Sequence, residues 1–374
     1  MTYIIIGADI VPTKSNLDYF VDNRVYELLD EETSLFLKKA HYRIFNLEVP
    51  LVDTIQPIVK EGPCLSAPTK VINGIKSLDI DLMTLANNHI LDQGDIGLSS
   101  TLNCLDSCKI NHIGAGANIF EAQKPFFISF NNKTVAVYAC AEHEFSIAGY
   151  NDPGANPFDP LKSFDEIKSI KSKSDYLIIL YHGGKEHYRY PSPGLQKICH
   201  KFVESGADLV VCQHSHCVGC MEKYLAGQII YGQGNFIFDY SDNECWQTSI
   251  LIGINDDFCV EFFPIQKNGK GIKKGSEKIV KEFLERSEKI KDEEFVKNEY
   301  NEFSRSLINE YLYAFAGYHS FLFRLINRIS HGNLLKMVNL FKYKRRNMNR
   351  ILNYIECESH RELIINAIKE YRNF

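Results

Sequence analysis

Short apolar runs of strand length alternate with helical patterns from residue 1 to about residue 250, and this alternation constrains the fold more than any other feature. Such alternation is typical of an α/β sheet. Helices are expected at Tyr19–Ala40 and between Pro193 and a stop at Gly206. The expected strands are Tyr3–Ile6, Arg43–Leu47, Leu82–Leu85, Phe126–Phe130, Thr134–Cys140, Tyr176–Tyr181, Leu209–Cys212, Gln228–Tyr231, Ser249–Ile254 and Cys259–Phe263.

The last hundred residues change character, and we predict a division into a domain of residues 1–270 and a helical C-terminal extension of residues 271–374. The segment 311–355 contains no Asp or Glu but eight Lys or Arg, interleaved with apolar residues. Two interpretations stay open. The segment could be a basic amphipathic element that docks on a membrane or a partner, or a helical subdomain whose basic face lies in water.

The composition is that of a globular protein, since 45% of the 374 residues are hydrophobic and 24% are charged. The net charge of −5 gives no general attraction to nucleic acid. The N-terminal run resembles a first strand rather than a signal peptide, and no apolar run is long enough to span a bilayer. Eleven cysteines without a regular framework indicate reduced thiols. These features together predict a cytoplasmic protein.

Polar residues gather where the expected strands end. Taken singly, each is most often a cap, a turn residue or a structural histidine. Their succession matters because ligands of an open α/β sheet bind at the carboxyl ends of its strands. Carboxylates, an amide and several imidazoles suit a pair of divalent metal ions such as Mn, Fe or Zn. The strand ends are Gly7-Ala8-Asp9, Asn46-Leu47-Glu48, Asn87-Asn88-His89, His182-Gly183-Gly184 and the run "QHSH" that holds His214 and His216.

The last of these runs is flanked by three cysteines, with Cys212 before it and Cys217 and Cys220 after it. If its backbone stays extended, His214 and His216 leave on the same side and can serve one metal or two neighbouring metals. Two metals bridged by a carboxylate suit hydrolysis at phosphorus. Cys217 and Cys220 have the spacing of a zinc ribbon or redox pair, but the sequence has no second matching pair. We therefore assign both, with Cys212, to packing.

Six motifs occur in an order that resembles the poly-γ-glutamate capsule-synthesis family, the CapA-like proteins of the calcineurin-like metallophosphoesterase superfamily. They span roughly residues 3 to 240 and read "GADI", "FNLEVPL", "LANNHILDQGDIGL", "LYHGGKEHYRYPSPG", "GADLVVCQHSH" and "GQIIYGQGNFIFD". The resemblance implies an α/β fold with a two-sheet β-sandwich core flanked by helices. It also implies two divalent metal ions at the strand ends.

Carried over position by position, the resemblance implies a ligand set and a proton donor. The ligands are Asp9 and His216 for the first metal, Glu48 as the bridge, and Asn88, His182 and His214 for the second. His89 is implied as the proton donor to the leaving oxygen, with Asp92 orienting its ring. Many superfamily members have a histidine two residues after the first aspartate, but this sequence has Val11 there. The first metal therefore lacks one ligand of the superfamily's set.

Four further residues are candidates for substrate binding. Asn87 lies beside the ligand position Asn88, and Glu142 follows another strand in "CAEHEF". Glu186 follows His182 by four residues and is either a pocket carboxylate or a solvated loop acid. Asn235 follows two glycines in "GQGNFIFD", and a structural turn is the alternative interpretation.

The leading functional hypothesis is a metal-dependent hydrolase that acts on a phosphorylated small molecule or polymer precursor in capsule or surface-polymer biosynthesis. The rival is a non-hydrolytic accessory protein of polymer synthesis or export. The rival is motivated by Val11 and by the basic segment 311–355, which could place the chain at the inner face of the membrane. A transferase or ligase ranks last, because the sequence has no phosphate-binding G-x-x-x-x-G-K-[ST] loop. A nucleic-acid partner is not expected, since a short basic run such as Lys342–Arg346 is usually solvated.

Overall fold

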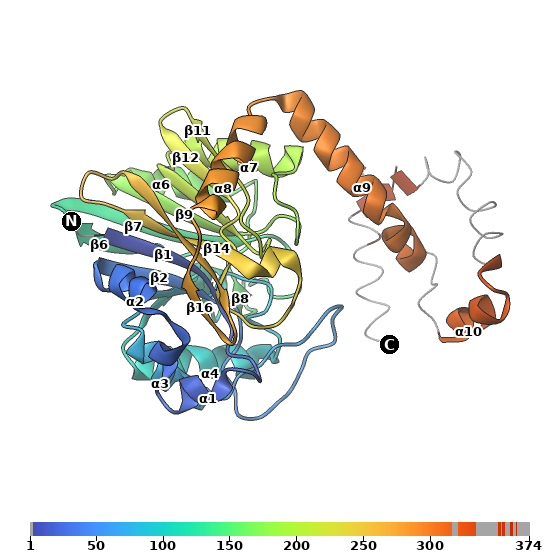
Figure 1. Ribbon diagram of the computed structural model, residues 1–374, viewed down its shortest axis with the longest axis horizontal. Coiled ribbons are helices and arrows are strands. Elements are labelled where there is room, and N and C mark those ends of the chain that lie inside the picture. The colour runs from blue at the N-terminus through green and yellow to red at the C-terminus, as the bar shows by residue number, and fades with distance from the viewer. Residues whose placement is uncertain are drawn as a thin grey trace. The chain divides into compact units, whose positions relative to one another are not determined.

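The computed structural model describes residues 3–315, 321–333, 351–352, 354–355, 360–361 and 364 (Figure 1). Its contacts divide the chain into two compact units, Met1–Tyr300 and Asn301–Phe374. The first unit contains the β-sheets and the strand ends singled out above.

The first sheet has the strand order β16-β15-β14-β1-β2-β3-β4, and β13 pairs with the end of β1 (Figure 1). The central strand β1 (Tyr3–Ile10) runs parallel to β2 (Ala40–Leu47) and antiparallel to β14 (Thr248–Ile254). All of β1 is buried, which explains why it is apolar on both faces. The other strands are β3 (Leu82–Thr84), β4 (Asn111–Ile113), β13 (Asn235–Ile237), β15 (Val260–Asn268) and β16 (Gly271–Lys274).

The second sheet has the order β11-β12-β10-β9-β7-β6. Its inner strands run parallel, and its two outer strands pair antiparallel. The parallel strands are β7 (Lys133–Ala141), β9 (Tyr176–His182), β10 (Leu209–Gln213) and β12 (Gly227–Tyr231), and the outer ones are β6 (Phe126–Phe130) and β11 (Met221–Tyr224). A short pair, β5 (Ala115–Gly116) and β8 (Gly154–Ala155), stands apart.

The two sheets pack face to face as a sandwich. Successive side chains of a strand point to opposite faces, so each sheet contributes alternate residues to the core between them. This shared core includes Ile4 and Ile6 of β1, Val135 and Val137 of β7, and Ile178 and Leu180 of β9. The intervening residues belong to two other clusters, one including Ile5 and Phe45, the other Tyr138 and Ile179. The predicted α/β fold with a two-sheet core flanked by helices is confirmed.

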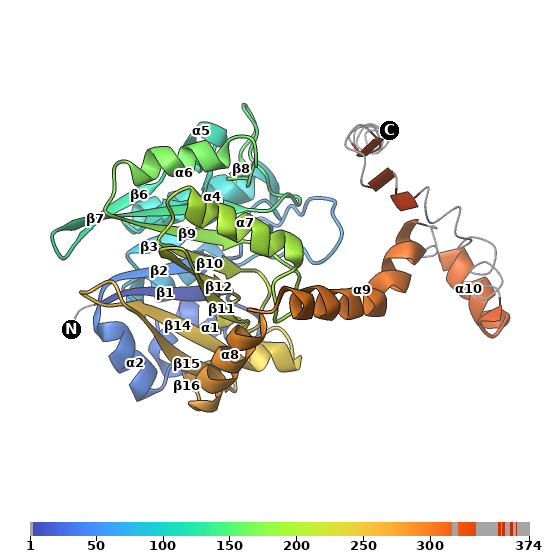
Figure 2. The ribbon, with the colours of Figure 1, turned by 90° about the horizontal axis from the view of Figure 1, so that it is seen from above.

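Helices cover the outer faces of both sheets (Figures 1 and 2). On the first sheet lie α1 (Leu17–Val21), α2 (Glu31–Lys38), α3 (Ile72–Ser77), α4 (Gly94–Ser107) and the short helices η1 (Val25–Leu28) and η2 (Thr69–Val71). With the second sheet lie α6 (Ser163–Lys171) and α7 (Pro193–Glu204), while α5 (Ile119–Ala122) packs on the β5–β8 pair and η3 (Glu244–Gln247) precedes β14. As predicted, α7 begins at a proline and is followed by Gly206, whose φ is +117°.

The predicted helix Tyr19–Ala40 is wrong as a single element, because the chain forms α1, η1 and α2 there instead. Asn23 has a φ of 58°, which a right-handed helix does not admit. Asp30 then starts α2 anew, since its side chain accepts a hydrogen bond from the Thr33 backbone N–H. The apolar periodicity that predicted one helix is shared by three short ones that pack on the same sheet.

The predicted domain boundary at residue 270 falls between two paired strands. β16 continues the first sheet by pairing with β15, and α8 (Lys278–Lys289) inserts Ile279 and Phe283 into the core between the sheets. The compact units divide instead between Tyr300 and Asn301. The charged surface of α8 suggested an extension, but its buried stripe makes it part of the sandwich.

The second unit is helical where the structure describes it, with most of α9 (Glu293–Phe315) and α10 (Phe321–Ile329). Much of the predicted docking segment 311–355, including 334–350, lies outside the described residues. Among the helices of the described residues, none has both the length and the apolar character to cross a membrane.

Candidate metal centre

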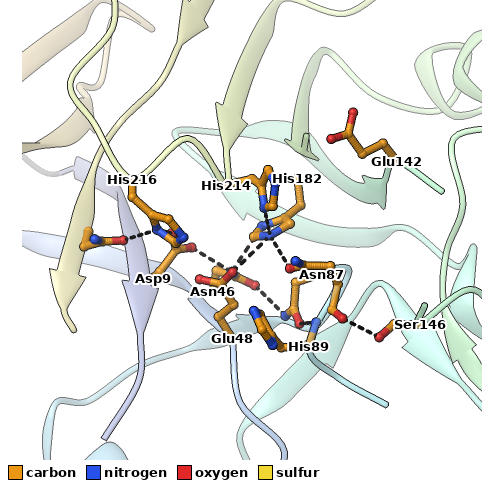
Figure 3. Close-up of polar contacts among 12 residues, drawn as sticks. Asp9, Asn46, Glu48, Asn87, His89, Glu142, Ser146, His182, His214 and His216 are labelled. Atoms are coloured by element: carbon orange, nitrogen blue, oxygen red, sulfur yellow. Dashed lines mark hydrogen bonds and ion pairs between the residues drawn. The ribbon is translucent and has the colours of Figure 1, made fainter. Parts of the chain in front are cut away.

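Five polar strand ends meet at one edge of the sandwich (Figure 3). Parallel strands of one sheet end on the same side, which brings the ends of β1, β2 and β3 together, and likewise those of β9 and β10. Asp9 lies in β1 and Glu48 directly follows β2. His182 ends β9 and His214 directly follows β10.

Three polar atoms converge on one ring nitrogen, His182 Nε2. Glu48 Oε1 lies 3.2 Å from it, Asn88 Oδ1 3.1 Å and His214 Nδ1 3.2 Å. A ring nitrogen carries one proton or one lone pair, so hydrogen bonding cannot satisfy all three contacts. A cation among these four buried side chains would satisfy them, because each then offers it a lone pair.

A second cluster shares Glu48 with the first. Ligand atoms of Asp9, Glu48 and His216 all lie within 4.8 Å of one another, as do those of Glu48, His182 and His214. Asp9 Oδ1 accepts a hydrogen bond of 2.7 Å from Asn46 Nδ2. Asp9 Oδ2 and both Glu48 oxygens are buried without a hydrogen-bond partner in the described part of the chain. Buried carboxylates without partners are costly, and coordination of a divalent cation is one way to compensate this cost.

Burial sets the protonation of these groups. It raises the pKa of Asp9 well above its ordinary value and that of Glu48 to about 7. It lowers the pKa of His182 and His214, and that of His216 to about 3. The three imidazoles are therefore neutral at pH 7 and keep lone pairs for a metal. Bound cations would draw the carboxyls back to their charged forms.

The backbone at the two clustered histidines is not extended, contrary to the geometry assumed from their spacing. φ is 82° at His214 and 53° at His216, both in the left-handed region. Such conformations cost about 1–3 kcal/mol for residues other than glycine and concentrate at functional sites. The turns, rather than the pleat of β10, direct the rings toward Glu48 and Asp9.

Asn235 supports His216 from the neighbouring strand. β13 pairs with β1 so that Asn235 lies opposite Asp9, and its Oδ1 is 2.9 Å from His216 Nδ1. The Trp246 ring packs against that of His216, with ring centroids 4.4 Å apart and the two planes tilted by 31°. Asn235 thus reaches the candidate metal centre through its contact with the ring of His216.

The predicted proton donor His89 lies beside Glu48 (Figure 3), and its Nδ1 is 2.6 Å from Asp92 Oδ2. His89 is 8% exposed and Asp92 is fully buried. The predicted pair is therefore brought together, with the ring held through Nδ1 and Nε2 left for another partner.

The other predicted substrate residues differ in their placement. Asn87 is fully buried and its amide donates to Asn46 Oδ1 and to the Leu47 carbonyl, so it braces the strand ends and offers a substrate no free donor. Glu142 accepts a hydrogen bond from the Gly184 N–H, and burial raises its pKa. Figure 3 shows Glu142 apart from the clusters. Glu186 is half-buried, and its charge contributes to the raised pKa of Glu48.

Two residues without a predicted site role complete the site. Asn46, which the sequence marked only as part of a polar strand end, links Asp9 to Asn87, and its place two residues before Glu48 on β2 was the signal for it. Lys60 lies on the loop after β2 and contacts both Asp92 and His89. A single lysine in a polar loop gives no sequence signal.

The cysteines lie as predicted. Cys212 and Cys220 are buried in the cluster that includes Tyr138, and Cys217 is buried in the cluster that includes Phe45. The two members of the C-x-x-C spacing therefore pack in different cores.

Comparison of the sequence with known proteins identifies the family of this chain. The model of "Bacterial capsule synthesis protein PGA_cap" matches residues 9–240. Capsule biosynthesis protein CapA of Bacillus anthracis is 28% identical over 215 residues, which cover 55% of this chain and 52% of that protein. A "Probable polyglutamine synthesis accessory protein" of Mycobacterium tuberculosis is 25% identical over 210 residues, covering 53% of this chain and 55% of that protein. The chain spans about half the length of these curated relatives.

Solved structures of lower similarity also align. A phosphatase from Mycoplasma pneumoniae has a TM-score of 0.41 and 15% identity, covering 72% of this chain and 90% of that one. A 5'-nucleotidase precursor from Thermus thermophilus has a TM-score of 0.39 and 11% identity, covering 82% of this chain and 59% of that one. At these scores neither structure bears on what this chain does. The family match, in contrast, takes in every proposed ligand from Asp9 to His216 and more than half of the sequence, and the chain therefore belongs to the PGA_cap family of bacterial capsule synthesis proteins.

Proposed function

We propose that this protein is a metal-dependent hydrolase of phosphoesters that acts on a phosphorylated intermediate of capsule or other surface-polymer assembly. The observation that carries the proposal is Glu48, which belongs to both ligand clusters and whose buried oxygens have no hydrogen-bond partner among the described residues. A carboxylate shared by two clusters suits a pair of ions, and a pair of ions suits in-line displacement at phosphorus.

The residues have distinct roles in this proposal. Asp9 and His216 would hold one divalent ion and Asn88, His182 and His214 a second, with Glu48 available to both. Such ions, when bound, would supply Lewis-acid polarisation of phosphoryl oxygens and a nucleophile at neutral pH. His89 donates a proton to the leaving oxygen from Nε2, because Nδ1 is occupied by Asp92. The polymer intermediate is suggested by the family and by the names of the relatives.

The test is metal content together with turnover of 4-nitrophenyl phosphate in Mn²⁺, for wild type and His214→Ala. We expect close to two metal equivalents and metal-dependent turnover in wild type, and at least a hundredfold loss of turnover with lowered metal content in the variant. His41→Ala, an exposed histidine at the opposite end of β2, is the matched control. Absence of both metal and turnover in wild type under any divalent ion would reject the proposal.

A second candidate is an accessory protein that docks on the inner face of the membrane, and α10 favours it. Leu325, Ile326 and Ile329 are 43%, 43% and 70% exposed, and their spacing places them on one face of the helix. The exposed Arg324 and Arg328 follow each other by one turn. Apolar and basic faces side by side suit the surface of an anionic bilayer, and such a location is cytoplasmic.

Vesicle co-sedimentation tests this candidate. We expect the protein to bind phosphatidylglycerol vesicles but not phosphatidylcholine vesicles, and the double variant Arg324→Glu/Arg328→Glu to bind at least about tenfold more weakly. Arg305→Glu, which changes an exposed arginine of α9, is the control. Equal sedimentation of both proteins, or none with either lipid, contradicts membrane docking and leaves the hydrolase proposal untouched.

A further inference from the structure

Lys60 is an inward-pointing lysine on an exposed loop. Its neighbours Val59 and Glu61 are exposed, yet its own side chain is 2% exposed. Burying an ammonium group costs several kcal/mol unless it is paired, so a loop does not place one inside the protein without compensation. The partner it meets there is Asp92, which is fully buried.

The contacts of Asp92 divide between its two oxygens. Lys60 Nζ lies 2.5 Å from Oδ1, and Oδ2 accepts a hydrogen bond of 2.6 Å from the Leu65 N–H of the same loop. Oδ2 is also the oxygen that lies 2.6 Å from His89 Nδ1. With both oxygens engaged, the carboxylate cannot rotate about its terminal bond without losing a contact to a buried group.

Two further groups lie near Lys60 Nζ. His89 Nδ1 is 3.3 Å away, but as the donor to Asp92 Oδ2 it accepts no hydrogen bond from the ammonium group. The centroid of the Phe145 ring, on the loop after β7, is 5.6 Å away. The ammonium group therefore packs between the carboxylate and an aromatic face, where a cation is favoured. The Ile58 N–H adds a backbone contact by donating to the Asp92 carbonyl.

We infer that Lys60 is a positioning residue for proton donation by His89. By holding Asp92 Oδ1, it presents Oδ2 to His89 Nδ1, which fixes the tautomer and the plane of the imidazole and leaves Nε2 for the leaving oxygen. The inference rests on the proposed hydrolase function. It adds a residue that belongs to neither the ligand set nor the His89–Asp92 pair.

Two esters with different leaving groups separate this role from a purely structural one. Nitrophenolate leaves without a proton, whereas the alkoxide of glycerol 2-phosphate needs one. Lys60→Met is expected to lower turnover of glycerol 2-phosphate by about 10- to 100-fold and that of 4-nitrophenyl phosphate by less than about threefold. Lys60→Gln keeps an N–H donor for Asp92 and is expected to recover part of the loss. Lys70→Met, which changes the exposed lysine of η2, is the control.

A measurement that does not depend on turnover, that of the His89 tautomer, completes the test. In zinc-loaded protein labelled with ¹⁵N-histidine, long-range ¹H–¹⁵N correlation identifies the tautomer of His89. Wild type is expected to hold the proton on Nδ1, and Lys60→Met to show a mixture of both tautomers. Equal losses on the two esters with an unchanged tautomer would overturn the inference and leave Lys60 as a loop anchor. If wild type cleaves neither ester, the proposed function fails, while the tautomer still decides whether Lys60 positions His89.

Discussion

At the level of single residues, the candidate site depends on two carboxyl groups, those of Asp9 and Glu48, that folding removes from water. Asp9 and Glu48 are fully buried, close to each other, and short of hydrogen-bond partners in the part of the chain that the structure describes. Both acidic side chains destabilise the metal-free fold when charged, and under the proposed function both would serve as ligands of a cation. The burial that lowers the stability of the metal-free protein would then raise its affinity for metal.

Glu48→Gln should expose this cost in metal-free protein. The folded-state pKa of Glu48 is raised to about 7, so the stability that this group contributes is present below its ordinary value near 4.5 and is lost as pH rises through 7. Glutamine cannot ionise, so the stability of the variant relative to wild type should grow by about 2 kcal/mol between pH 5.5 and pH 8.

Urea denaturation in EDTA at the two pH values measures this difference. The exposed Glu61→Gln serves as the control. A constant difference between Glu48→Gln and wild type at both pH values would show that burial does not raise the pKa of Glu48.

At the level of elements, the turn after β10 decides where the histidines lie. Gly219 closes this turn against β12, and its N–H donates to the Gly232 carbonyl. A Cβ at this position would lie 1.9 Å from the Tyr231 carbonyl oxygen, so only glycine fits without displacement of the backbone. The spacing of apolar residues in the flanking helices and strands does not predict this contact.

Gly219→Ala should therefore destabilise the protein by about 2 kcal/mol or more, because backbone must move to admit the methyl group. The shift should also weaken metal binding, since His214 and His216 lie on the same turn. Thermal unfolding and metal titration measure the two effects. Gly194→Ala, in the first turn of α7 where a Cβ meets nothing closer than 3.7 Å, should be neutral or stabilising by up to about 1 kcal/mol.

At the level of the whole molecule, the first unit needs its charged C-terminal helices. Ile279 and Phe283 of α8 close the core between the sheets, and Ile290 and Val296 are buried beyond them. A chain cut at residue 270 would expose this core and remove β16 from the edge of the first sheet. The boundary of a folding unit follows from the buried apolar surface rather than from the change in composition.

Truncation distinguishes the two boundaries. A fragment of residues 1–300 should be folded and bind metal as the full chain does, whereas a fragment of residues 1–270 should be insoluble or molten. Circular dichroism, thermal unfolding and metal content of the two fragments check this. Cooperative unfolding of the shorter fragment at the temperature of the longer one would contradict the assignment of β16 and α8 to the first unit.

Prediction from the sequence succeeded where a local pattern of residues determines how the elements are arranged in the fold. Strand periodicity predicted an α/β fold, and the polar strand ends predicted that their side chains gather at one edge, because parallel strands end on the same side. The two-sheet core was implied by the resemblance to the family, and the ligand set implied by that resemblance stays a prediction. Prediction from the sequence failed at Tyr19–Ala40, where one periodicity is shared by three short helices, and at Gln213–His216, where left-handed turns replace an extended backbone. Backbone reversals depend on contacts from distant segments, which spacing does not encode.

The order of motifs along the chain was enough to determine the fold class and the family, since both depend on residue type and local period, and it supplied the candidate ligands that remain a prediction. Tertiary structure alone decided that Glu48 is shared by two clusters, that Asn235 faces His216, and that Lys60 reaches Asp92. These contacts join residues that are far apart along the chain or lie on loops without periodicity. Burial and charge in the folded chain determine which of these residues meet, so no pattern in the sequence could predict the contacts.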